Sequence, residues 1–140
     1  MRVLVAVDGS ANSDRAVRHL IDLVPEWGPM EVLLLNVQPP MTYIELLTSP
    51  REELIAQLTQ SAGREASQSA IALLNAAGVP YTLHIVAGYP GETIAQFARK
   101  QGCDLIVMGT RGMGAIPNLL LGSVATKVIH LADIPVTLVK

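Results

Sequence analysis

Two glycine-containing segments of the chain carry the residue types that bind anionic ligands. The longer one runs from Gly109 through Arg111 and Gly112 to Gly122 and Ser123. Glycines let the backbone come close to a phosphate and adopt positive φ, and a helix beginning at Gly122-Ser123 would turn its free N–H groups toward an anion. The Arg111 guanidinium can bind a terminal phosphate, and the Ser123 hydroxyl adds a donor or a helix cap. The alternative is a flexible glycine-rich turn in which Ser123 only caps the helix.

The shorter segment is Asp8-Gly9-Ser10, which ends the apolar run that opens the chain. An aspartate at the end of a strand can accept hydrogen bonds from both hydroxyls of a ribose, or help to hold Mg²⁺ or Mn²⁺. Asp-Gly is also a common turn pair, so the position of Asp8 taken alone favours a turn or capping residue.

Five short segments are expected to be strands, because they are rich in Val, Leu and Ile and bounded by turn residues. The near-continuous apolar runs in the first, second and fourth are typical of central strands in a parallel sheet. The third alternates more, which favours an edge. The five segments are Arg2–Asp8, Glu31–Val37, Tyr81–Ala87, Asp104–Gly109 and Pro135–Val139.

Four helices are expected between these strands, since apolar residues recur there at helical spacing. They begin after Ser13, cover Leu54 to Ala77, run from about Pro90 to Gly102, and cover Val124 to Ala132. Regular alternation of strands and helices predicts a single α/β domain over residues 1–140, with a doubly wound parallel sheet covered by helices on both faces. The long connection Gln38–Pro50 is either a lid, a loop that faces a partner, or a loose loop.

This architecture gives the two glycine-containing segments a common location. Ligands of open parallel sheets bind outside the carboxyl ends of the strands, at the point where the strand order reverses. If the first and fourth strands are neighbours, Asp8 and the loop after Gly109 face each other across that crevice.

Composition excludes several other classes of function. The formal net charge is −2 and only 4% of the residues are aromatic, so the basic stripe and stacking platforms of a nucleic-acid binder are missing. No apolar run approaches the roughly 18 residues of a membrane span. The single cysteine, Cys103, excludes an internal disulfide and fits a reducing, cytoplasmic location; we expect it to be buried.

Motifs of catalysis and metal binding are also missing from the sequence. It has no Walker A lysine, no G-x-G-x-x-G after the first strand and no G-x-S-x-G elbow. The three histidines, His19, His84 and His130, lie in different elements without partners at metal-ligand spacing. We therefore expect no catalytic residues and no side-chain metal cluster.

The spacing Gly109-x2-Gly112-x9-Gly122-Ser123 resembles the nucleotide-binding signature of the universal stress proteins, and the likeness extends over the whole chain. The opening Val5-Ala6-Val7-Asp8-Gly9-Ser10 is similar to the first strand of that family and its ribose-binding aspartate. Leu35-Asn36-Val37, Asp104–Gly109 and Ile134–Val139 are similar to its second, fourth and fifth strands. The resemblance implies a Rossmann-like sheet of five parallel strands in the order 3-2-1-4-5, flanked by four helices.

The resemblance also implies the roles of individual residues. Asp8 would bind the ribose, with Ala6, Val7 and Val37 around the adenine and Met108 and Gly109 beside the ribose and first phosphate. Gly112, Gly122, Ser123 and Val124 would hold the phosphates, mainly through backbone N–H groups. The family also implies ATP as the ligand, with ADP or AMP as alternatives, and a homodimer formed through Pro135–Val139. A Mg²⁺ or Mn²⁺ ion that arrives with the nucleotide could lie near Asp8, and the sequence leaves this open. Arg111 is added on charge grounds alone.

Three hypotheses about function follow. The first is a regulatory module that senses ATP, dimerises and presents an altered surface to an unidentified protein partner. The second is a slow ATPase or autophosphorylating protein, with Ser10, Thr110 and Ser123 as acceptors; the sequence lacks an evident general base for it. The third is a scaffold in which the loop no longer binds a nucleotide.

Overall fold

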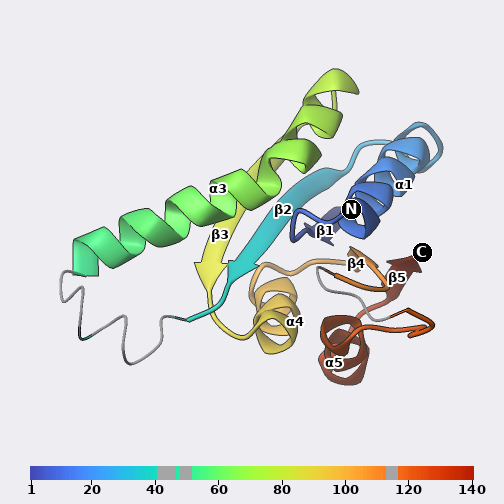
Figure 1. Cartoon of the computed structure of the whole chain (residues 1–140). Coiled ribbons are helices and arrows are strands. Elements are labelled where there is room, and N and C mark those ends of the chain that lie inside the picture. Colours follow the sequence, from blue (N-terminus) through green and yellow to red (C-terminus); the bar gives the residue numbers. More distant parts are fainter. Residues whose placement is uncertain (41–46, 48–51, 113–116) are drawn as a thin grey trace.

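The computed structural model describes residues 1–40, 47, 52–112 and 117–140 of the chain (Figure 1). Five strands and four helices alternate along these described residues. In chain order they are β1 (Arg2–Ala6), α1 (Ala11–Trp27), β2 (Glu31–Gln38), α3 (Glu52–Ala76), β3 (Tyr81–Ala87), α4 (Pro90–Lys100), β4 (Leu105–Gly109), α5 (Ser123–Leu131) and β5 (Val136–Val139).

All strand pairs are parallel, and the order across the sheet is β3-β2-β1-β4-β5. The central strand β1 pairs on one side with β2 and on the other with β4, so that Val3 lies beside Val32 and Leu105. The predicted fold class and strand order are confirmed, and β3 is an edge strand, as its alternating pattern indicated. The reversal of strand order lies between β1 and β4, which places the loops that follow them at one edge of the sheet.

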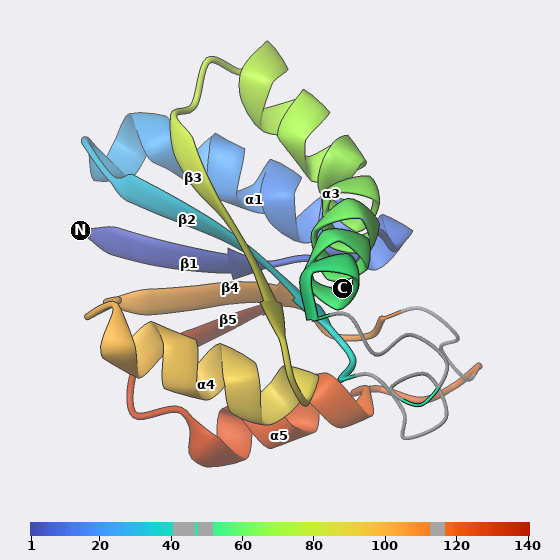
Figure 2. The same ribbon diagram turned by 90° about the vertical axis from the view of Figure 1, so that its left-hand side faces the viewer.

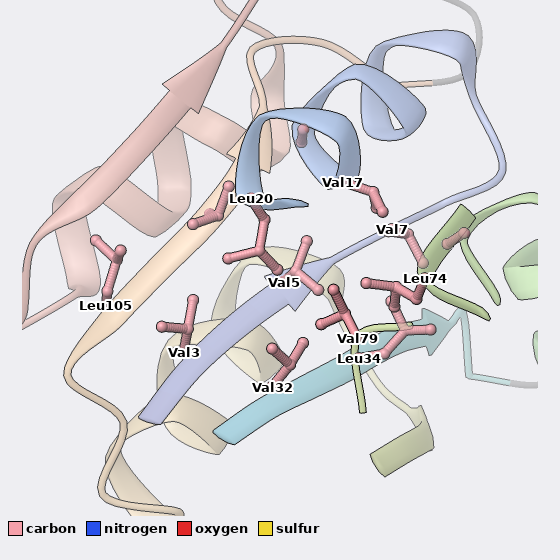
Figure 3. Packing of buried hydrophobic residues seen from close by; sticks show 13 residues of the cluster. Val3, Val5, Val7, Val17, Leu20, Val32, Leu34, Leu74, Val79 and Leu105 are labelled. Atoms are coloured by element: carbon pink, nitrogen blue, oxygen red, sulfur yellow. The ribbon is translucent and has the colours of Figure 1, made fainter. Parts of the chain in front are cut away.

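Two helices cover each face of the sheet (Figure 2). On the side of α1 and α3, the buried cluster contains Val5 of β1, Leu34 of β2 and Leu74 of α3 (Figure 3). On the side of α4 and α5, Leu4 and Leu35 pack against Ile94 and Val128. Since consecutive strand residues point to opposite faces, the continuous apolar runs of β1, β2 and β4 supply both clusters.

The first helix begins earlier than the sequence predicted. Its N-cap is Ser10, whose Oγ accepts a hydrogen bond from the backbone N of Ser13 at 3.2 Å, so Ser13 lies inside the helix. Strand β1 ends at Ala6 rather than Asp8, because the Asp8 carboxylate accepts a hydrogen bond from the N–H of Ser10 at 2.9 Å and closes a turn. Several other strand ends differ from expectation by one residue.

Most of the long connection Gln38–Pro50, for which a lid, a partner-facing loop and a loose loop were the alternatives, lies outside the described residues, as do residues 113–116 of the glycine loop. Within the described part of the chain, none of the helices combines the length and the apolar character needed to cross a membrane.

Candidate functional site

A cavity of about 410 Å³ opens at the carboxyl ends of β1 and β4. Every residue that the sequence analysis assigned to a ligand site lines this cavity. These residues are Ala6, Val7, Asp8, Val37, Met108, Gly109, Arg111, Gly112, Gly122, Ser123 and Val124. The structure therefore brings together four segments that are widely separated in the sequence.

One end of the cavity is apolar. It lies on the face of the sheet covered by α4 and α5, because Ala6, Leu35, Met108 and Ile94 all belong to the cluster on that face. Val37 of β2 packs against the same cluster and is only partly buried. The sequence analysis missed Leu35 and Ile94 as lining residues, since their apolar periodicity indicates a core position and nothing more. This end can hold a flat, mainly apolar group.

Asp8 is the one carboxylate among the described residues that line the cavity. Its Oδ1 atom accepts the hydrogen bond from Ser10 that fixes the turn, and its backbone N lies 3.4 Å from Ser13 Oγ. A Cβ atom built on Gly112 would collide with the other carboxylate oxygen, Oδ2. Gly112 has no positive φ, so a side chain at this position would disturb the Asp8 carboxylate rather than the backbone.

The N-terminus of α5 forms the opposite wall. Its N-cap is Gly122, with φ −75° and no side-chain cap, and Ser123 is the first helical residue. The interpretation of Ser123 as the cap is therefore wrong. Since Thr126 N is the donor to Gly122 O at 3.0 Å, the N–H groups of Ser123 and Val124 precede the helical hydrogen-bond ladder. Both residues line the cavity, and this end of the helix favours an anion.

The backbone of the glycine loop is held in place by hydrogen bonds to its own residues and to α1. Gly122 N donates to Thr110 O at 2.7 Å, and a Cβ on Gly122 would lie 3.4 Å from Thr110 O and Arg111 Cα. Arg111 N donates to Asn12 Oδ1 at 2.7 Å. Sequence reasoning missed Asn12, since an asparagine at the start of a helix gives no sign of its long-range contacts.

A second buried amide supports the β1 end of the cavity. Asn36 of β2 is 2% exposed, and its Nδ2 donates to Val7 O at 2.8 Å. Gln38 Nε2 donates in turn to Asn36 Oδ1 at 2.7 Å. Val7 N donates to Leu35 O at 2.9 Å. Both the N–H and the C=O of Val7, the residue before Asp8, are therefore hydrogen-bonded to β2.

The histidines and the cysteine do not form a further site. His84 of β3 stacks at an angle on Phe97, with ring centroids 4.9 Å apart. Among the described residues, no group of three or more His, Cys, Asp or Glu could hold a metal ion. Cys103 is buried, as predicted. Burial raises the pKa of its thiol above the ordinary value, although the nearby Arg2 charge acts in the opposite direction.

Comparison with known sequences finds one family. The model of the universal stress protein family matches residues 1–140. Universal stress protein MJ0531 of Methanocaldococcus jannaschii is 34% identical over 139 residues, which cover 99% of this chain and 81% of that protein. A universal stress protein of Thermus aquaticus is also 34% identical, over 99% of this chain and 97% of its own.

Solved structures of universal stress proteins have the same fold as this chain. Protein MJ0577 of Methanocaldococcus jannaschii superposes with a TM-score of 0.82 at 30% identity, over 99% of this chain and 94% of its own. The universal stress protein of Archaeoglobus fulgidus in complex with dAMP has a TM-score of 0.72 at 24% identity, over 100% and 98%. An Arabidopsis thaliana family member with AMP bound has a TM-score of 0.68 at 20% identity, over 100% and 91%.

Proposed function

This chain belongs to the universal stress protein family, and we propose that it is a regulatory module of that family which binds ATP in the cavity between β1 and β4. The observation that carries the proposal is the composition of the cavity walls. The Asp8 carboxylate lies on one wall, and the N-terminus of α5, without a side-chain cap, forms another. These are the acceptor and the donors that a ribose and its phosphates require.

The apolar end of the cavity suits the base. Ala6, Val37 and Met108 offer surfaces against which an adenine ring can lie, with Ile94 of α4 closing the pocket. Pockets of this kind combine an apolar lining with a few polar groups that set orientation. Asp8, next to this end, would then accept hydrogen bonds from the ribose hydroxyls.

The phosphate end is supported by the close packing of the glycine loop. Gly112 lies against Asp8, and Gly122 lies close to the backbone of Thr110 and Arg111. We propose that the N–H groups of Ser123 and Val124 donate to the phosphates, and that the half-buried Arg111 binds the terminal one. Three phosphates rather than one would use both the helix N-terminus and Arg111, which is why we propose ATP.

Relatives of the same fold support an adenine nucleotide. The two neighbours in complex with dAMP and AMP, and a third universal stress protein in complex with cAMP, all bind ligands that contain adenine. A divalent cation would be held by the phosphates with Asp8, since the described residues do not form a metal cluster of their own. An ion of this kind neutralises phosphate charge.

The test is calorimetric titration of the chain with ATP, ADP and AMP, with and without Mg²⁺ or Mn²⁺, and of Gly122→Val. We expect the native chain to bind ATP and Gly122→Val to lose it, because a branched side chain keeps phosphate away from the backbone. Gly122→Ala is the matched control for the fold, since its Cβ would make only contacts of 3.4 Å or longer in the free chain. Equal unfolding temperatures of the three proteins without ligand would show that the loss is local.

Two results would contradict the proposal. If ATP binds to Gly122→Val as it does to the native chain, the helix N-terminus is not the phosphate site. If the native chain binds none of the three nucleotides, the scaffold hypothesis replaces the proposal.

We also propose that the chain forms a homodimer through β5 and that a protein partner reads the nucleotide state. β5 is an edge strand whose four residues are all partly exposed. Pro135 O and Val139 O accept hydrogen bonds from β4 and Thr110. The polar backbone groups of Val136 and Leu138 therefore point to the open edge, where a second strand can pair.

A further inference from the structure

One buried side chain connects the glycine loop to the C-terminal strand. Asn12 is 5% exposed. Its Oδ1 accepts from Arg111 N at 2.7 Å, and its Nδ2 donates to Val139 O at 3.0 Å. Asn12 is the second residue of α1, so a single amide joins α1, the loop after β4 and the end of β5.

The loop is built closely around this amide. A Cβ on Gly109 would collide with Asn12 Oδ1 and approach the Asn12 backbone carbon to 3.1 Å. Gly109 has no positive φ, so its backbone conformation does not require glycine. The absence of a side chain at position 109 is therefore explained by Asn12, against which the end of β4 packs.

The end of β5 is in turn anchored from several sides. Val139 O accepts from Thr110 N at 2.9 Å in addition to Asn12. Lys140 O accepts from Arg15 Nε of α1 at 2.9 Å. The Asn12 side chain is thus held by its hydrogen bond to the end of β5. In this position its Oδ1 atom accepts the hydrogen bond from the backbone N–H of Arg111, the residue that precedes Gly112.

We propose that Asn12 is a positioning residue for phosphate binding by the glycine loop. It fixes the backbone at Arg111, and so sets where Gly112 and the Arg111 side chain meet the phosphates, while the adenine and ribose end of the cavity does not depend on it. The inference rests on the proposed nucleotide function, because it assigns to Asn12 the part of the affinity that comes from phosphate.

The test compares ATP with adenosine, which lacks phosphates. We expect Asn12→Ala to weaken ATP binding by about tenfold, the effect of one lost hydrogen bond to a positioned backbone, and to leave adenosine binding within about twofold of the native value. Asn36→Ala is the matched control. It also removes a buried asparagine, but that amide holds Val7 at the base end, so ATP and adenosine should change by the same factor.

A second measurement does not depend on any ligand. In the free chain, hydrogen exchange of the Arg111 amide should become faster in Asn12→Ala. It should remain slow in Asn36→Ala, which leaves the hydrogen bond between Arg111 N and Asn12 Oδ1 in place.

Two outcomes overturn the inference: an ATP-to-adenosine affinity ratio that Asn12→Ala does not change, or an Arg111 amide that exchanges at the native rate in that variant. Failure of the native chain to bind either ligand would instead refute the nucleotide proposal, and the exchange experiment would still decide whether Asn12 holds the loop.

Discussion

The contact between Gly112 and Asp8 leads to a sharp prediction for Gly112→Ala. The added Cβ would collide with Asp8 Oδ2, which is the end of a side chain that can rotate away. The backbone itself accepts alanine, since φ at this position is not positive. The fold should therefore survive, while the Asp8 carboxylate is moved from the place where the ribose hydroxyls would meet it.

The size of the effect follows from the bonds involved. Rotating Asp8 out of its rotamer costs about 0.5–1.5 kcal/mol, and the hydrogen bond from Ser10 N is weakened with it, so unfolding should need about 1–2 kcal/mol less. A hydrogen bond between a hydroxyl and a charged carboxylate contributes about 1.5–3 kcal/mol. Losing it should weaken ATP binding by about 10- to 150-fold.

The assay is calorimetric titration with ATP and with dideoxyadenosine triphosphate, which has the same phosphates but neither ribose hydroxyl. Gly112→Ala should weaken ATP binding and leave binding of the dideoxy analogue at the native value. In a double-mutant cycle, Gly112→Ala should add little to Asp8→Ala, since both act on one carboxylate. An equal loss for both nucleotides would refute the reasoning, because it would place the alanine in the path of the phosphates.

Two further predictions concern Cys103 and the open sheet edge. Burial raises the pKa of the Cys103 thiol in the folded chain above its value in the unfolded chain, which is about 8.5. The neutral, buried thiol should therefore contribute its full stabilisation below that unfolded-state pKa. This stabilisation should be lost as the pH rises from there through the folded-state pKa. Urea unfolding at several alkaline pH values should show that the free energy of unfolding falls more steeply with pH in the native chain than in Cys103→Ala. The same dependence on pH in both proteins would contradict the prediction. At the edge, Val136→Pro removes an N–H that points away from β4, so light scattering should find a monomer where Val136→Ala stays dimeric. A dimer that survives Val136→Pro, or a native chain that is already monomeric, would argue against pairing through β5.

Much of the fold follows from local patterns in the sequence. The continuous apolar runs around Val5, Leu34 and Val107 can only be buried on both faces of a sheet, and this requirement largely determines the central strands. The early start of α1 was not predicted, because Ser10 and Ser13 are both good N-caps by residue type. Only the turn closed by Asp8 and Ser10 decides between them.

The candidate site was predictable where its residues share a linear motif and not where they act across the fold. Gly109, Gly112 and Gly122 have a recognisable spacing, and Asp8 follows a strand. Asn12 depends on Arg111 and Val139, which are 99 and 127 residues away. Nothing near Asn12 in the chain signals such partners.

The uncapped start of α5 also bears on the balance between stability and function. An acidic side chain at Gly122 would interact with the helix dipole and make the free chain more stable by about 0.3–1 kcal/mol. That carboxylate would also fill the cavity with a permanent negative charge, an internal mimic of bound phosphate. Glycine leaves the helix end uncapped, so the free chain is slightly less stable than its own fold permits. Under the proposed function, that loss of stability is what keeps the helix end open for the phosphates of the nucleotide.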